Sequence, residues 1–151
     1  MSKAKNSLGV TLFIETAVAG VYQKIGEVTD IPGILGDKSG RIDVTSFDSV
    51  GYKDYIGDGL KDAPEFSFKC NYVADDLGQV RVYELGQSNA NTKIKVEFDD
   101  QITAGVGGNP TSIIRDGYIP GIPNIVPGKG AQLTLDFSFQ ASGAPTVVLA
   151  A

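Results

Sequence analysis

The chain has 151 residues, a formal net charge of −5, one cysteine and no histidine. One domain of this length can bury its own core, and 42% hydrophobic with 21% charged residues is typical of a water-soluble globular protein. The composition excludes an internal disulfide, the Ser-His-Asp and Cys-His catalytic arrangements and the usual zinc sites, and its acidic balance disfavours a nucleic-acid-binding surface.

Alternation of apolar and polar residues runs through most of the chain and predicts strands with one buried and one solvent-facing side. The clearest example places Phe66, Phe68, Cys70 and Tyr72 on one face. Glycine- and proline-rich segments such as GVGGNP and PGIPNIVPGKG separate the strands. In chain order, the predicted strands cover residues 9–16, 21–28, 41–46, 66–72, 93–99, 112–119, 133–140 and 145–149.

The segment ADDLGQVRVYELGQ breaks this pattern and predicts a short helix. Asp75 or Asp76 is suited to cap its start, and Gly86 or Asn89 to end it. The stretch VRVYEL also alternates as a strand would, but we favour the helix on its periodicity. The apolar residues at helical spacing are Leu77, Val80 and Tyr83. The expected fold class is mainly β: two packed antiparallel sheets, as a β-sandwich or flattened barrel, with one short flanking α-helix and a long loop.

The stretch IDVTSFDSVGYKDYIGDGLKD, residues 42–62, begins as a strand and then loses every regular period. We predict a long loop over 47–62 that combines glycine, aromatic and acidic residues. Its side chains Phe47, Tyr52 and Tyr55 are costly to expose, and exposed aromatic patches usually mark a partner site. The loop is therefore expected to bind another protein.

The sequence contains no complete motif for catalysis, phosphate binding or calcium binding. PGKG at 127–130 lacks the rest of a phosphate-binding loop. A loose Ca²⁺ site among Asp48, Asp54 and Asp58 lacks the ligand spacing of a calcium loop, so we favour solvated carboxylates. Cys70 lies on the apolar face of its strand, which favours a buried side chain over a nucleophile. We predict no catalytic, cofactor-binding or metal-binding residues and no enzymatic activity.

Two strings in the sequence resemble a known family. The string DVTS-x-DS…Y…Y-I…GL-x-D and the earlier G-E-V-x-x-I-x-G, residues 26–33, are similar to the tail tube protein (major tail protein) of long-tailed, non-contractile bacteriophages of the lambda-like group. The similarity runs from residue 8 to about 140, but only these two strings are specific. The family often has proline before the Gly-Leu pair, where this chain has Asp58. The longer string is matched by Asp43, Val44, Thr45, Ser46, Asp48, Ser49, Tyr52, Tyr55, Ile56, Gly59, Leu60 and Asp62.

The resemblance implies a structural virion protein. Members of this family form a β-sandwich flanked by a helix, and six subunits form a ring whose strands close into a barrel around a lumen. The rings stack into a hollow tail tube through which DNA is ejected into the host, and an acidic wall would repel its phosphates. The loop after the DVTS strand stacks one ring on the next. The residues that this role implies here are Phe47, Asp48, Ser49, Tyr52, Lys53, Asp54, Tyr55, Ile56, Asp58 and Leu60.

The resemblance also implies partners and a location. The partners are further copies of the chain, a tape measure protein, a tail terminator and tail tip proteins, while DNA passes through the lumen without specific binding and no small-molecule substrate is involved. The sequence contains no apolar run long enough to span a bilayer and no signal-peptide pattern. These absences favour a protein that stays in the cytoplasm where it is made, and the resemblance implies the virion tail as its location after assembly in the host bacterial cytoplasm.

The expected domain organisation is a single tail-tube domain over 1–151, with 1–7 and 141–151 as flexible or inter-subunit arms. Two other interpretations remain open. A related ring-forming tube protein of a contractile tail or a secretion apparatus would share the fold. A monomeric β-sandwich that binds carbohydrate is less favoured, because such a module would want exposed tryptophan and this chain has none.

Overall fold

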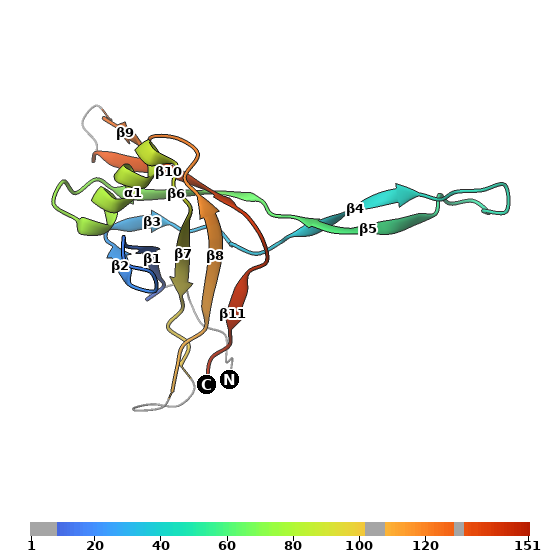
Figure 1. Ribbon diagram of the computed structural model, residues 1–151, viewed down its shortest axis with the longest axis horizontal. Coiled ribbons are helices and arrows are strands. Elements are labelled where there is room, and N and C mark those ends of the chain that lie inside the picture. Colours follow the sequence, from blue (N-terminus) through green and yellow to red (C-terminus); the bar gives the residue numbers. More distant parts are fainter. Residues whose placement is uncertain (1–8, 102–107, 129–131) are drawn as a thin grey trace.

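The structure, a computed structural model, describes residues 9–101, 108–128 and 132–151. Strands dominate these residues, and one short helix accompanies them (Figure 1). The predicted mainly β fold class with two antiparallel sheets and one short flanking helix is confirmed. The elements are, in chain order, β1 (Thr11–Glu15), β2 (Tyr22–Ile25), β3 (Val28–Asp30), β4 (Lys38–Asp43), β5 (Tyr55–Asp62), β6 (Glu65–Asn71), α1 (Leu77–Ser88), β7 (Thr92–Glu97), β8 (Ser112–Tyr118), β9 (Asn124–Val126), β10 (Thr134–Ala141) and β11 (Thr146–Val148).

The larger sheet is antiparallel and folds back on itself. Its strand order is β2-β1-β7-β8-β10-β6-β3, with β11 added to β8 and β9 added to β10. Strands β8 and β10 pair only at Tyr118 with Gln140 and Gly117 with Ala141, and beyond this corner β6 and β10 run across β7 and β8 (Figure 1). Gly117 permits the corner, because a Cβ there would collide with the carbonyl oxygen of Gln140. The two halves therefore bury their facing sides, as in orthogonal sheet packing.

The core lies between these two halves and is supplied by the predicted alternation. Phe68 of β6 and Phe137 of β10 stack with their ring centroids 5.2 Å apart. Each of the strands β1, β6, β7 and β10 buries alternate residues, as a sheet with one covered side requires. The apolar core residues are Leu12, Ile14, Ile25, Ile34, Phe66, Phe68, Val82, Leu85, Ile94, Val96, Ile113, Ile119, Phe137, Phe139 and Ala141.

Helix α1 begins and ends at two of the predicted capping residues. The Asp76 carboxylate accepts hydrogen bonds from the backbone N–H groups of Gly78 at 2.9 Å and Gln79 at 3.4 Å, which satisfies two of the free donors at a helix start. Asn89 adopts the left-handed conformation at the other end and donates its backbone N–H to Leu85.

The side of α1 that faces the core differs from the one that the spacing of apolar residues indicates. Val82 and Leu85 are buried, together with Gly78 and Gly86. A Cβ at Gly78 would collide with the backbone of β2, so glycine lets this side of the helix approach the sheet. The apolar residues that the helix leaves exposed are Leu77, Val80 and Tyr83.

The smaller sheet replaces half of the predicted long loop. Residues 55–62, expected within the loop 47–62, form β5, which pairs with β4 in a two-stranded antiparallel sheet. The strand expected at 41–46 is displaced to 38–43 and belongs to this hairpin and not to the core. The physical reason is cross-strand pairing: Ile42 lies opposite Ile56, so both segments gain a partner in each other.

The C-terminal segment 141–151, expected to be a flexible or inter-subunit arm, contacts its own chain. Strand β11 pairs with β8, and beyond it the backbone N–H of Ala151 donates to the carbonyl of Asn109 at 2.9 Å. The Asn109 side chain also donates to the carbonyl of Leu149 at 3.1 Å. The expectation for residues 1–7 lies outside the described residues.

Candidate self-association surface

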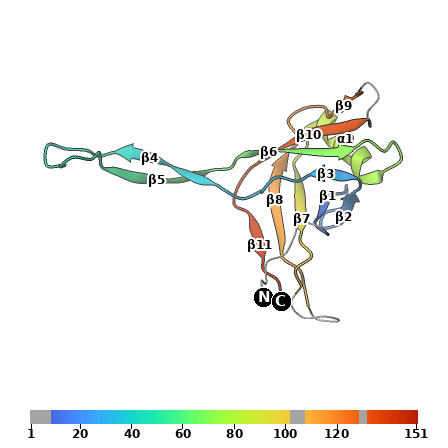
Figure 2. The same cartoon turned by 180° about the vertical axis from the view of Figure 1, so that it is seen from behind.

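Residues 38–62 form an arm that extends away from the body of the molecule (Figures 1 and 2). The arm consists of β4, the tip segment 44–54 and β5. All eight residues of β5 are exposed, as are nearly all those of β4. Because an isolated two-stranded hairpin is only marginally stable in water, an arm of this kind is suited to contact another surface.

The two faces of the arm differ in chemistry. One face carries the directly paired Ile42 and Ile56, both exposed. The opposite face carries Arg41 and Tyr55, and the Arg41 guanidinium lies 4.3 Å from the centroid of the Tyr55 ring, a cation–π contact. The arm is therefore amphipathic, with an aliphatic face that nothing in the described part of the chain covers.

Hydrogen bonds within the tip segment hold it in a defined shape. The Asp43 carboxylate accepts from the backbone N–H of Thr45 at 2.9 Å, and the Thr45 hydroxyl accepts from the backbone N–H of Asp54 at 2.8 Å. The Ser49 hydroxyl in turn donates to the Asp54 carboxylate. Hydrogen bonds from the side chain and backbone of Thr45 lower the pKa of Asp43 from its ordinary value. The tip is thus preorganised by its own polar groups.

These polar contacts leave the apolar side chains of the tip pointing into solvent. The side chains at the tip are almost fully exposed to solvent, with relative exposures of 110% for Phe47, 90% for Val50 and 87% for Tyr52. Large apolar side chains that are exposed together usually mark an interaction site. The tip therefore presents a preformed apolar contact surface.

Asp58 shapes the arm near its middle. Its carboxylate accepts from the backbone N–H of Leu60 at 3.0 Å, across Gly59, whose φ is +84°. The Asp58 carboxylate also lies so close to Gly40 that a Cβ at residue 40 would collide with it. At this position the pairing of β4 with β5 shifts its register, between Ser39 and Arg41. Such a bulge increases the twist of a two-stranded sheet, and the Asp58 carboxylate lies against it.

The ten residues proposed from the sequence for self-association all lie on the arm. Six of them, Phe47, Asp48, Ser49, Tyr52, Lys53 and Asp54, belong to the tip, and Tyr55, Ile56, Asp58 and Leu60 belong to β5. Their contact with another copy stays a prediction. Sequence reasoning missed Ile42 and Val44, which it assigned to the core, although both are exposed. It also missed Val50, whose signal was its place between two predicted contact residues.

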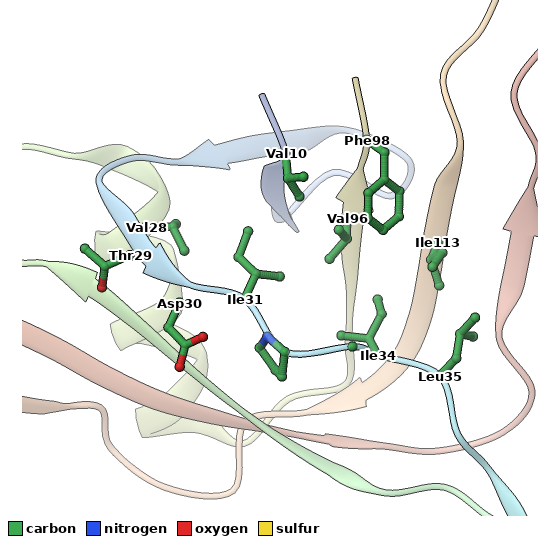
Figure 3. A pocket seen from close by; sticks show the side chains of 12 residues that line it. Val10, Val28, Thr29, Asp30, Ile31, Ile34, Leu35, Val96, Phe98 and Ile113 are labelled. Atoms are coloured by element: carbon green, nitrogen blue, oxygen red, sulfur yellow. The ribbon is translucent and has the colours of Figure 1, made fainter. Parts of the chain in front are cut away.

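A pocket of about 490 Å³, lined mostly by apolar side chains, opens on the body beside the root of the arm (Figure 3). It lies between the irregular segment 31–35 and the ends of β1, β7 and β8, and Figure 3 shows Ile31, Ile34, Val96 and Phe98 around it. The only polar side chains in its lining are those of Thr29 and Asp30. A pocket with this lining suits an apolar side chain and offers no pair of groups for acid–base catalysis.

The described residues offer neither a metal-binding cluster nor a membrane-spanning helix. They contain no group of three or more histidine, cysteine, aspartate or glutamate side chains placed to hold a metal ion. None of their helices is both long enough and apolar enough to pass through a membrane.

Comparison with solved structures identifies similar folds. A chain from the tail of an empty GTA particle with C6 symmetry matches with a TM-score of 0.73 and 14% sequence identity, over 96% of this chain and 99% of that chain. A chain from the six-fold symmetrised cryo-EM structure of the anti-feeding prophage baseplate matches with a TM-score of 0.68 and 6% identity, over 99% and 98%. No protein-family model matches the sequence, and no curated protein matches it significantly. The chain therefore has a fold that occurs in phage-like tail assemblies.

Proposed function

We propose that the protein is a structural subunit of a phage tail tube and not an enzyme. The observation that carries this proposal is the arm: an ordered hairpin with exposed apolar side chains, attached to a body whose fold occurs in a C6-symmetric particle tail. A protrusion whose apolar side chains are exposed is suited to bind another molecule, and a second copy is the simplest partner. Contact between different patches of identical subunits continues indefinitely unless it closes on itself, which suits a tube.

In this proposal six subunits form a ring and rings stack. Strands β2 and β3 end the path of the larger sheet, and such edges can pair with a neighbouring subunit. The arm, with the ten residues from Phe47 to Leu60 named above and with Ile42, Val44 and Val50, binds the adjacent ring. DNA passes through the lumen, and the net charge of −5 disfavours adhesion of its phosphates. The partners are a tape measure protein, a tail terminator and tip proteins, and the location is the virion tail after assembly in the host cytoplasm.

A tube protein of a contractile tail or secretion apparatus is the second candidate. The likeness to a chain of the anti-feeding prophage baseplate favours it, because the TM-score of 0.68 is close to that of the GTA tail. The DVTS string favours the non-contractile type. Electron micrographs of particles that contain this protein, taken before and after contact with host cells, separate the two, because only a contractile tail shortens an outer sheath around its tube.

Removal of the apolar side chains at the tip tests the proposal. Phe47→Ser with Tyr52→Ser keeps the backbone and the polar network of the tip, so the protein should fold normally. We expect the wild type to form rings or tubes at high concentration in negative-stain micrographs, and the variant to form none that exceed a single ring.

The matched control is Val18→Ser, which removes an exposed apolar side chain in the β1–β2 turn, away from the arm. It should polymerise like the wild type. Long tubes from the tip variant would contradict the role of the arm. A wild type that stays at 15.9 kDa on a sizing column at every concentration, and does not add to preformed tails, would favour the monomeric binding module.

A further inference from the structure

Arg115 is a fully buried cation on the core-facing side of β8. Its side chain is 0% exposed, and its guanidinium makes a bidentate ion pair with Asp37, with Nη1 to Oδ1 at 2.6 Å and Nη2 to Oδ2 at 3.0 Å. Nη2 also donates to the carbonyl of Gly143 at 3.3 Å, and the Cζ atom of Arg115 lies 5.8 Å from the centroid of the Phe66 ring. Asp37 is 78 residues away in the sequence and lies one residue before β4. The ion pair thus joins the core directly to the root of the arm.

A buried ion pair is not a general means of stabilisation. The desolvation of two charges offsets most of their attraction, and well-packed apolar side chains often stabilise a core equally well. The Nε atom of Arg115 has no hydrogen-bond partner in the described part of the chain, so the pairing is also incomplete. A fork-shaped, two-point contact does supply orientation, because both distances are satisfied in only one arrangement. The geometry is therefore better explained by positioning than by stability.

The root of the arm needs such a restraint on one of its two strands. Ile34 is the last buried residue before β4, whereas Leu35 and Gly36 are exposed, and Gly36 has a φ of +108° with open space around it. In the described chain, Asp37 makes the only hydrogen bonds that join segment 35–37 to the core. Without the ion pair, the chain between Ile34 and β4 would pivot at Gly36.

The other strand of the root is already fixed by the backbone. The Gln140 side chain donates to the carbonyl of Ala63 at 3.1 Å, and the backbone N–H of Ala141 donates to the carbonyl of Pro64 at 3.3 Å. A hairpin attached to the core through one strand can rotate about that attachment. Attachment through both strands defines the direction of the hairpin. Asp37 supplies the second attachment.

We infer that Arg115 is the positioning residue of the arm, because its ion pair with Asp37 sets the direction in which the arm leaves the body. The inference itself concerns a single subunit. Only its consequence rests on the proposed function: an arm held at one angle meets the adjacent subunit in one register. The direction of the arm is a property of a single subunit and is measurable without any polymer.

The experiment measures the distance between the arm and the body by pulsed electron paramagnetic resonance. Spin labels are attached at Asp48→Cys in the tip and Gln87→Cys on the exposed side of α1, in the full chain with buried Cys70 left in place. The ion pair is removed by Asp37→Asn or changed by Arg115→Lys, which keeps the charge but loses the fork. We expect a narrow distance distribution in the wild-type background, and one at least twice as broad in both variants, with unchanged circular dichroism.

The control is Asp116→Asn on the same strand. It removes the exposed ion pair with Lys93, whose Nζ lies 3.0 Å from the Asp116 carboxylate, and should leave the distribution narrow. Where a single variant fails to fold, Asp37→Leu with Arg115→Met removes both charges together and keeps an apolar contact. A folded double variant with a broad distribution supports the inference, and one with a narrow distribution overturns it.

Polymer formation is then scored separately. With the proposed function correct, the variants with a broad distribution should form tubes at least ten-fold less than the wild type. A wild type that never polymerises would overturn the proposed function, while the distance distribution still decides the role of Arg115. An unchanged distribution in both single variants would overturn the positioning role even if tubes form.

Discussion

Ile42 and Ile56 lie directly opposite each other across the two strands of the arm, and they are 49% and 53% exposed. In a sheet with a buried side such a pair would face the core. Here the pair faces solvent. The arm therefore has the apolar pairing of a buried strand pair, but no other element packs over it in the described part of the chain. Strand pairing within a single subunit accounts for the backbone of the arm but leaves its apolar face unexplained.

Replacement of this pair should separate association from folding. Ile42→Thr with Ile56→Thr keeps β-branched side chains, and exposed substitutions of this kind usually change stability by less than about 0.5 kcal/mol. The apolar area lost from an interface should weaken each contact by roughly 1–2 kcal/mol, about ten-fold in affinity. Sedimentation assays should show polymer only at about ten-fold higher concentration. Val18→Thr is the control, and equal loss of polymer in that variant would contradict a specific role of the pair.

Asp76 should be the more important of two adjacent aspartates. Its carboxylate caps α1, and its Oδ2 also accepts from the backbone N–H of Gly26 at 2.8 Å, which ties the helix to the end of β2. Asp76→Ala should lower the free energy of unfolding by about 1–2 kcal/mol in urea titrations. The exposed neighbour Asp75 makes neither contact, so Asp75→Ala should stay within about 0.5 kcal/mol of the wild type. An equal decrease in the free energy of unfolding for both variants would contradict a specific capping role of Asp76.

Gly78→Ala should destabilise the protein, although alanine favours helix formation by about 1 kcal/mol over glycine. The Cβ would collide with the carbonyl oxygen of Lys24 and lie 2.7 Å from the Cα of Ile25, and both belong to backbone that cannot rotate away. Overpacking of this kind typically costs about 1–3 kcal/mol. Thermal unfolding should therefore show a lower Tm. Gln87→Ala, on the exposed side of the same helix, is the control, and a raised Tm for Gly78→Ala would contradict this packing.

The ion pair at the root of the arm should make stability depend on pH in the acid range. The hydrogen bond from Arg115 is the largest cause that lowers the pKa of Asp37 below its ordinary value of 3.8, opposed by desolvation and aided by the charges of Arg115 and Lys61. The stabilisation is therefore fully present above pH 3.8 and is lost as the pH falls through the lowered pKa. The Tm difference between the wild type and Asp37→Asn should be largest near neutrality and shrink as the pH falls below 3.8 and through the lowered pKa of Asp37. A difference that is constant over this range would contradict the assignment.

Cys70 should not react with thiol reagents in the folded protein. Burial is the main cause that raises its pKa to about 11, and the carboxylates of Asp76 and Asp136 contribute in the same direction. At pH 8 the reactive thiolate is then only about one part in a thousand of the thiol. We expect a coloured disulfide reagent to label Cys70 in urea but not under native conditions. Rapid stoichiometric labelling of the native protein would show that β6 opens.

The strands of the core were predictable because their signal is local. Alternate burial of Phe66, Phe68 and Cys70 follows from a period of two and needs no knowledge of the partner strand. The capping residues of α1 were predictable for the same reason, since Asp76 and Asn89 act on their own helix. The ten residues that the family resemblance implies for ring stacking all lie on one projecting element, and their contact with another copy stays a prediction.

The arm and its attachment were not predictable in this way. Residues 55–62 form a strand only because β4 lies beside them, and the alternation of Ile42 with its neighbours does not distinguish a core strand from an exposed one. Arg115 did carry a signal, because it occupies a position between Ile113 and Gly117 where the alternation requires a core residue. A charge at such a position predicts a buried partner but does not identify it.

The sequence by itself determined the mainly β class, the strands of the core and the ends of the helix, because these depend on residues a few positions apart. Only the tertiary structure decided which side of α1 is buried, that residues 38–62 leave the body as an arm, and that Asp37 pairs with Arg115. Periodicity fixes which side chains share a face but not what that face meets. The close approach that Gly78 allows and the ion pair between residues 78 positions apart arise only when the chain has folded.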